Sequence, residues 1–142
     1  MNSINPGPVA VIGAGVIGGG WTARFLLNGI DVKIHDPNPE AGRRLREMIA
    51  NAERAWDRLT SAPLPKKGSL SFCGTIQEAV DGAVFIEECI PENLELKRKI
   101  LNEIETGAAT DAPIGSSTSG IRPSEMQSKM KHPERLLVTH PF

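Results

Sequence analysis

The sequence has only two cysteines, few aromatic residues and no recurring metal-ligand spacing. Cys73 and Cys89 do not combine with any of the three histidines in a pattern typical of zinc sites. We therefore expect no metal, and we expect both cysteines to be small core residues. A disulfide between them is possible but has no support in a cytosolic chain.

Long hydrophobic runs and an excess of one charge are also absent. The net charge is −1, so the chain has no basic field that would attract nucleic acid or an anionic membrane. No apolar run approaches the roughly 18 residues that suggest a membrane span. The stretch 1–6 lacks the basic and apolar regions of a signal peptide. We expect a cytoplasmic protein without nucleic-acid or membrane partners.

The 142 residues fit one domain, which would bury roughly two-thirds of its unfolded surface. Strand-like and helix-like segments alternate along the chain, which predicts an α/β fold with a Rossmann-type, doubly wound parallel sheet over residues 1–142. Strands are expected at 9–12, 31–36, 70–73, 82–88, 112–116 and 136–139, and helices at 16–28, 40–59, 75–81, 91–104 and 123–130.

Two of these helices carry further local signals. In the helix over 16–28, the large apolar residues Ile17, Trp21, Phe25 and Leu26 are expected to form the buried face. Three successive glycines at 18–20 weaken this helix, and close packing on the sheet and on a ligand explains them best. The helix over 75–81 is expected to begin with a capping box of Thr75 and Glu78.

A glycine-rich turn follows the first apolar run, and Gly13, Gly15 and Gly18 have the spacing of a dinucleotide-binding motif. Such a turn lets a pyrophosphate approach the backbone at the N-terminus of the next helix, where free N–H groups favour anions. The motif alone is weak evidence, because this spacing also arises by chance. The cofactor-binding residues expected in the turn are Gly13, Ala14, Gly15, Val16, Ile17 and Gly18.

Asp36 ends the second predicted strand, 23 residues after Gly13. An acidic residue about 20 residues after such a turn hydrogen-bonds the ribose hydroxyls of the adenosine. A carboxylate there would repel a 2′-phosphate, so NAD is favoured over NADP. The alternative is a solvent-exposed turn aspartate. The order of strand, glycine turn, helix and second strand favours the ribose role.

Polar residues recur where the predicted strands end. They are found at 13–18, Asp36, 88–92, 116–119 and His140. Ligands of open parallel sheets bind outside the carboxyl ends of the strands. The sequence therefore predicts one site along this edge of the sheet.

A nicotinamide cofactor restricts the reaction to hydride transfer, which needs a base for the alcohol proton. The chain contains no tyrosine, which excludes the tyrosine–lysine mechanism of the short-chain dehydrogenases. His140 is the expected base, because an unperturbed imidazole titrates near neutral pH. Ser119 would hydrogen-bond the substrate oxygen. The alternatives are a surface histidine and a turn serine.

Four segments resemble the L-3-hydroxyacyl-CoA dehydrogenase superfamily, and the similarity covers essentially the whole chain. The resemblance implies that Glu92 and Lys97 lie beside the cofactor or the substrate. It also implies that Ser119 holds the reacting oxygen near the nicotinamide, and that His140 is the base in oxidation and the acid in reduction. The 21 residues between Ser119 and His140 agree with the family pattern. The segments are 11–18, 92–97, 116–119 and 139–142.

The chain departs from the acyl-CoA members at two of these segments. Residues 116–119 are Ser-Ser-Thr-Ser and His140 is followed by Pro-Phe, where those members typically carry Asn-Thr-Ser-Ser and His-Phe-Phe-Asn. A CoA substrate is therefore disfavoured. Together with Trp21, these residues are most similar to the branch that oxidises carnitine, and next to the gulonate 3-dehydrogenase or lambda-crystallin branch.

In the family, the histidine motif continues into Asn-Pro, a glutamate that orients the imidazole, and a helical domain that forms a dimer. We therefore expect residues 1–142 to be the NAD-binding domain of a longer, homodimeric enzyme, able to bind NAD but with little turnover alone. The competing hypothesis is a stand-alone dinucleotide-binding module without chemistry.

Overall fold

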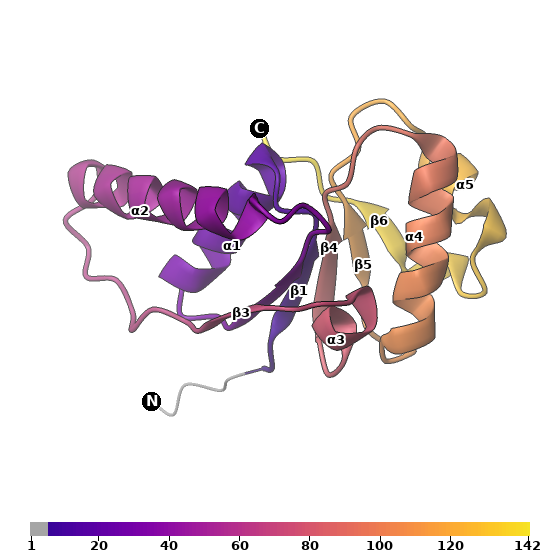
Figure 1. Cartoon of the computed structure of the whole chain (residues 1–142), viewed down its shortest axis with the longest axis horizontal. Helices are drawn as coiled ribbons and strands as arrows, with labels where there is room; N and C mark the ends of the chain where they lie inside the picture. The colour runs from indigo at the N-terminus through magenta and orange to yellow at the C-terminus, as the bar shows by residue number, and fades with distance from the viewer. Residues whose placement is uncertain (1–5) are drawn as a thin grey trace.

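A six-stranded parallel sheet runs through the part of the chain that the computed structural model describes, residues 6–142 (Figure 1). Its strand order is β3-β2-β1-β4-β5-β6, which confirms the predicted Rossmann-type topology. Residues 1–5, which belong to the stretch expected not to be a signal peptide, lie outside the described residues. The strands are β1 (Val9–Ile12), β2 (Val32–His35), β3 (Leu70–Phe72), β4 (Phe85–Glu88), β5 (Ile114–Ser116) and β6 (Leu136–Val138).

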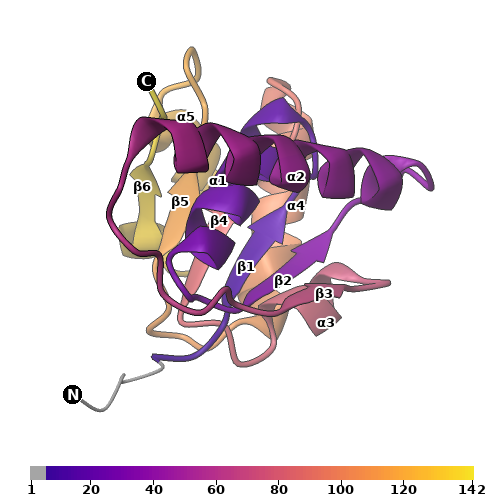
Figure 2. The same cartoon turned by 90° about the vertical axis from the view of Figure 1, so that its left-hand side faces the viewer.

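Helices cover both faces of the sheet. One pair, α1 (Val16–Leu27) and α2 (Ala41–Leu59), packs on one face, and α2 crosses in front of the sheet in Figure 2. The opposite face carries α4, with α3 and α5 at its ends (Figure 1). The first three strands extend the sheet to one side of β1, and after β3 the chain crosses over so that β4 pairs with the other side of β1. At this change in strand order, a crevice opens between the carboxyl ends of β1 and β4. The remaining bounds are α3 (Ile76–Val80), α4 (Leu94–Gly107), α5 (Pro123–Met126) and two 3₁₀ turns at Gln127–Lys129 and Pro133–Arg135.

The two faces of the sheet form two separate hydrophobic cores. Along β1, Ala10 and Ile12 pack with residues of α3 and α4, whereas Val11 packs with residues of α1 and α2. All four residues of β1 are buried, as expected of a central parallel strand covered on both faces. Within residues 6–142, no helix has the length and apolar character needed to cross a membrane.

The buried face predicted for α1 is largely wrong. Ile17 is 42% exposed, and the Trp21 and Phe25 rings stack on each other at the margin of the helix with a centroid distance of 5.5 Å. Small residues face inward because α1 lies very close to its neighbours: a Cβ on Gly19 would be 2.4 Å from Cε of Met48. The buried residues of α1 are Gly18, Gly19, Thr22, Ala23, Leu26 and Leu27.

Side-chain caps fix where α3 and α4 begin. Thr75 Oγ1 accepts a hydrogen bond from the Glu78 N–H at 3.1 Å, as predicted. The Glu78 carboxylate accepts from the Gly74 N–H at 2.8 Å rather than from Thr75, so the expected capping box is only half formed. Asn93 caps α4 in the same way, accepting from the Leu96 N–H at 2.9 Å.

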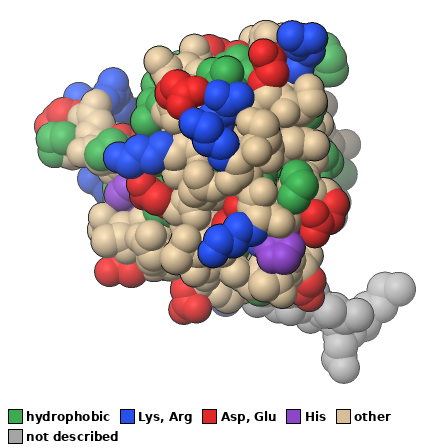
Figure 3. All heavy atoms as spheres, turned by 90° about the vertical axis from the view of Figure 1, so that its right-hand side faces the viewer, with side chains coloured by type: hydrophobic (Ala, Val, Ile, Leu, Met, Phe, Trp, Pro, Cys, Tyr) green, Lys and Arg blue, Asp and Glu red, His purple; other side chains and the backbone are tan. Residues whose placement is uncertain are grey.

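Acidic and basic side chains alternate on the surface formed by α4 and α5 (Figure 3). Glu95 pairs with both Arg98 and Lys129 there, and Arg122 pairs with Glu125. Exposed pairs of this kind contribute little to stability, about 0–1 kcal/mol each. This face is a solvated surface of mixed charge.

Replacing Thr75 with alanine should lower the free energy of unfolding by about 1 kcal/mol, because α3 loses its N-cap acceptor. Urea unfolding followed by circular dichroism would measure the change. Thr106→Ala is a matched control: Thr106 is exposed near the end of α4, and its hydroxyl only donates to the Asn102 carbonyl four residues earlier. Equal losses for both variants would contradict the capping role.

Candidate cofactor and catalytic site

The glycine turn between β1 and α1 is closed by contacts that no side chain could enter. Gly13 has a φ of +101°, and a Cβ there would lie 2.7 Å from the Cys89 carbonyl oxygen. A Cβ on Gly18 would lie 1.9 Å from the Gly13 carbonyl oxygen. At Gly15, in contrast, a Cβ would meet nothing within 4 Å, and no side chain caps α1. The helix N-terminus therefore faces open space, where an anion fits.

Asp36 lies beside this turn, as predicted. One carboxylate oxygen accepts a hydrogen bond from the Ala14 N–H and the other accepts from the Asn38 N–H, both at 2.8 Å. These contacts fix the orientation of the carboxylate on the rim of a cavity. Each oxygen keeps a further lone pair that can accept a hydrogen bond from a ribose hydroxyl.

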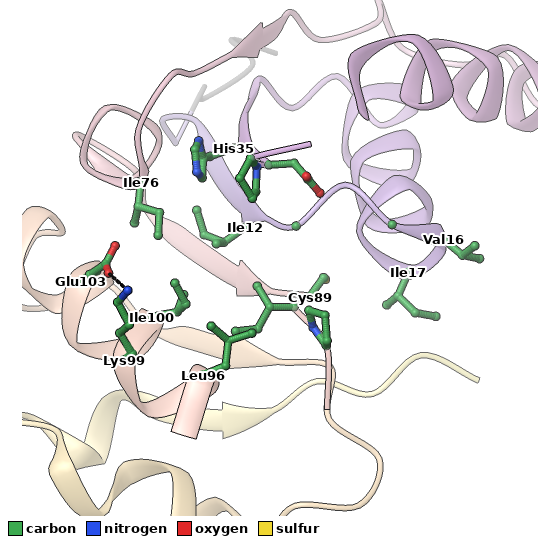
Figure 4. Close-up of a pocket in the computed structure, with 16 residues that line it drawn as sticks. Ile12, Val16, Ile17, His35, Ile76, Cys89, Leu96, Lys99, Ile100 and Glu103 are labelled. Carbon is green, nitrogen blue, oxygen red and sulfur yellow. Dashed lines mark ion pairs between the residues drawn. The ribbon is translucent and has the colours of Figure 1, made fainter. Parts of the chain in front are cut away.

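A cavity of about 660 Å³ extends from the turn across the crevice to α4 (Figure 4). Its size lies within the range of pockets that hold small ligands. Most of the lining is apolar, and Asp36 is one of its few charged residues. This arrangement suits a nucleoside whose base lies between apolar walls. The lining residues are Ile12, Gly13, Gly15, Val16, Ile17, His35, Asp36, Pro37, Ile76, Cys89, Ile90, Pro91, Leu96, Lys99, Ile100 and Glu103.

The α4 wall of the cavity was not predicted. Leu96 and Ile100, four residues apart, point toward the crevice, and Lys99 forms an ion pair with Glu103 beside them (Figure 4). Leu101 of the same helix is fully buried in the core. The apolar residues of α4 therefore occupy two faces of the helix, one in the core and one lining the cavity. An apolar surface wider than a single buried face requires was the sequence feature that could have indicated the cavity wall.

Lys97 does not line this cavity. Its ammonium group is buried and donates to both carboxylate oxygens of Glu88, at 2.7 and 3.0 Å, and to the Ile90 carbonyl oxygen at 3.1 Å. Glu92 lies 3.4 Å from the same ammonium group, has a side chain 44% exposed, and is also outside the cavity lining. Contact of Lys97 or Glu92 with the cofactor stays a prediction.

The segments that carry Ser119 and His140 follow the paired strands β5 and β6, so they lie next to each other at the carboxyl ends of the strands. The Ser116 hydroxyl donates to Glu88 at 2.5 Å, and the Thr139 N–H donates to the Ser116 carbonyl oxygen at 2.9 Å. Ser119 is exposed, and the half-buried His140 ring packs edge-on against Phe142, with 5.3 Å between the ring centroids. Within residues 6–142, no hydrogen bond joins Ser119 to His140. Their catalytic roles stay predictions.

Glu87 is a buried acid that the sequence did not single out. It lies on the opposite face of β4 from Glu88, and the Thr139 hydroxyl donates to its carboxyl group, with 2.8 Å to each oxygen. Burial raises the pKa of Glu87 to about 8, although the hydrogen bond from Thr139 opposes this shift. Near neutral pH the group is therefore mostly protonated.

The two cysteines are less buried than predicted. Both are free thiols of intermediate exposure, because each follows the end of a strand at the open edge of the sheet. Cys89 also lines the cavity, and burial raises the pKa of its thiol to about 12. This thiol is therefore not a reactive thiolate.

Together, the sheet, the glycine turn and the cavity define a dinucleotide-binding α/β domain. Residues 8–142 match the family described as 3-hydroxyacyl-CoA dehydrogenase, NAD binding domain. The chain belongs to this family. The match confirms the predicted superfamily and NAD as the cofactor.

Two relatives whose names specify a substrate match nearly all of the chain. It is 60% identical over 133 residues to an L-carnitine dehydrogenase/betainyl-CoA thioesterase of a Rhizobium species, covering 94% of this chain and 27% of that protein. It is 56% identical over 143 residues to an L-carnitine dehydrogenase of Mesorhizobium japonicum, covering 100% of this chain and 39% of that protein. The chain thus spans well under half the length of either relative.

A solved structure gives the same assignment of the fold. The crystal structure of 5-formyl-3-hydroxy-2-methylpyridine 4-carboxylic acid 5-dehydrogenase, an NAD⁺-dependent dismutase, superposes with a TM-score of 0.85 at 34% identity. The superposition covers 94% of this chain and 43% of that protein.

Glu87→Gln should remove part of the pH dependence of stability. Between about pH 4.5 and 8, folded Glu87 keeps a proton that the unfolded chain releases, so raising the pH lowers the free energy of unfolding. The slope from one such group reaches about 1.4 kcal/mol per pH unit. Urea unfolding at pH 5 and pH 8.5 should show that the variant gains stability relative to the parent at the higher pH.

The exposed acid Glu47 provides the control for this measurement, because Glu47→Gln should leave the slope unchanged. If Glu87→Gln and the parent chain have equal slopes, Glu87 is not the group responsible.

Proposed function

We propose that this chain is the NAD-binding part of a dehydrogenase that oxidises a secondary 3-hydroxyl group to a ketone, with L-carnitine as the substrate. The observation that carries the proposal is the 56% identity over the whole chain to a protein described as L-carnitine dehydrogenase. The geometry supports it, because the cavity beside Asp36 and the segments of Ser119 and His140 lie at one edge of the sheet.

In this proposal the chain holds NAD by three features. The open N-terminus of α1 at Gly15 would hold the pyrophosphate, and the Asp36 carboxylate would accept hydrogen bonds from the adenosine ribose. The apolar walls that include Ile76 and Ile100 enclose the adenine. Bound NAD supplies the acceptor for the hydride that leaves the substrate carbon.

The remaining chemistry is a proton transfer. An imidazole nitrogen of His140 takes the hydroxyl proton as the carbon–hydrogen bond breaks, and the Ser119 hydroxyl hydrogen-bonds the substrate oxygen as it becomes a carbonyl oxygen. One hydride and one proton leave the alcohol, which balances its two-electron oxidation. The partially buried His140 ring is shielded on one side by Phe142.

The pocket for the rest of the substrate is assigned to residues outside this chain. The proposal rests on the chain covering 27% to 39% of the two relatives described above. In the part of the chain that the structure describes, no carboxylate contacts the His140 imidazole, so nothing fixes its tautomer. We infer that the chain alone binds NAD with little turnover and that the longer enzyme is a homodimer.

NADH should bind the chain more tightly than NADPH, because the Asp36 carboxylate repels a 2′-phosphate. Asp36→Ala should weaken NADH binding about tenfold and reduce the preference over NADPH. Fluorescence titration of both cofactors would measure the two affinities. Asp57→Ala, an exposed acid on α2, is the control and should change neither. A parent chain that prefers NADPH would overturn the role of Asp36.

A chimera tests the activity. Residues 1–142 would be joined to the part of the Mesorhizobium japonicum protein that follows its matched region, and assayed with NAD and L-carnitine, L-gulonate or 3-hydroxybutyryl-CoA. We expect the highest kcat/KM with L-carnitine, and a loss of about 10²–10⁴-fold in His140→Ala. His132→Ala, at an exposed histidine away from this edge, is the control.

Preference for gulonate or the CoA thioester would correct the substrate. A folded chimera that binds NADH but oxidises none of the three would favour a binding module without chemistry.

A further inference from the structure

Glu92 contacts the residues on both sides of Ser119. One of its carboxylate oxygens accepts a hydrogen bond from the Thr118 hydroxyl at 2.9 Å and from the Gly120 N–H at 3.2 Å. Thr118 is 3% exposed, and its hydroxyl oxygen in turn accepts from the Ile121 N–H at 3.1 Å. A single carboxylate therefore anchors the residue before Ser119 and the residue after it.

The Glu92 carboxylate is itself held by the buried ion pair of Lys97 and Glu88. The second carboxylate oxygen of Glu92 lies 3.4 Å from the Lys97 ammonium group, which is buried and bonded to Glu88. Glu88 also accepts a hydrogen bond from the Ser116 hydroxyl at 2.5 Å, and its carbonyl oxygen accepts from the Ser117 N–H at 3.0 Å. Both ends of the loop over 116–121 are thus tied to the region between β4 and α4.

We infer that Glu92 is a positioning residue that holds the 116–121 loop so that the Ser119 hydroxyl faces the reacting oxygen. The inference rests on the proposed function for the role of Ser119, but the restraint on the loop does not. Ser119 is exposed between its two anchored neighbours. The loop backbone is therefore fixed while the hydroxyl group remains available to a ligand.

The charge state of Glu92 is consistent with this role. Partial burial alone would raise its pKa, but the hydrogen bond from Thr118 and the charge of Lys97 outweigh burial and lower it. The carboxylate is thus ionised near neutral pH, and an ionised acceptor makes stronger hydrogen bonds than a neutral one.

Three variants separate this role from direct contact with the cofactor. Glu92→Ala removes the acceptor, Thr118→Val removes one donor without changing a charge, and Glu92→Gln keeps an oxygen that can accept from Thr118 and Gly120. Glu95→Ala is the matched control: this exposed acid lies in the first turn of α4 and pairs with Arg98 and Lys129.

The ¹⁵N order parameter of the Ser119 amide in the chain reports the restraint directly. We expect it to fall from about 0.85 to below about 0.6 in Glu92→Ala and Thr118→Val, and to stay high in Glu95→Ala. Glu92→Gln should recover most of the order. NADH affinity should change less than threefold in Thr118→Val and Glu95→Ala, which leave the Glu92 carboxylate in place.

In the chimera described above, Glu92→Ala and Thr118→Val should lower kcat about tenfold or more, and Thr118→Val should do so with little change in the KM for NAD. Glu92→Gln should restore most of kcat. An unchanged order parameter in both loop variants would overturn the inference.

If Glu92→Ala fails to fold, Thr118→Val decides the outcome by the same measurements. An inactive parent chimera would refute the proposed function, whereas the order parameters would still support or overturn the restraint on the loop.

Discussion

The buried ion pair between Lys97 and Glu88 joins the first turn of α4 to the end of β4, and the site depends on this junction. Two charges in the interior are tolerated only when their remaining hydrogen-bonding positions are also satisfied. Here the Ile90 N–H and the Ser116 hydroxyl donate to Glu88, and the Ile90 carbonyl oxygen accepts from Lys97. Loss of one partner leaves an uncompensated charge, at a cost of about 3–5 kcal/mol. The pair therefore fixes the α4 wall of the cavity and the loop that carries Ser119 together.

The glycine turn and the strand end at Asp36 could be located from the sequence because their signals are local. Gly13 to Gly18 and Asp36 belong to consecutive elements, β1, α1 and β2, whose packing leaves little freedom in where the strand ends lie. The structure places the Asp36 carboxylate 2.8 Å from the Ala14 N–H, a contact that follows from this unit. The strands and long helices were also predicted, to within a few residues at their ends.

Other features could not be predicted, because they depend on contacts between distant segments. Glu92 and Thr118 are 26 residues apart and Glu87 and Thr139 are 52 apart, so no periodicity relates them. The α1 error has a different cause. Pattern analysis favours large apolar residues for a buried face, whereas this helix approaches so closely that glycine and alanine are needed there, and Trp21 is displaced to the margin.

The adjacent acids Glu87 and Glu88 contact both segments that lead to the predicted catalytic residues, Ser119 and His140. Side chains alternate along a strand, so the two carboxyl groups lie on opposite faces of β4. Glu88 pairs with an ammonium group on the α4 face and holds the segment that leads to Ser119, whereas Glu87 accepts a hydrogen bond from the Thr139 hydroxyl and is mostly protonated near neutral pH. Thr139 directly precedes His140. The segments that lead to Ser119 and His140 are therefore both attached to β4, one through Glu88 and the other through Glu87.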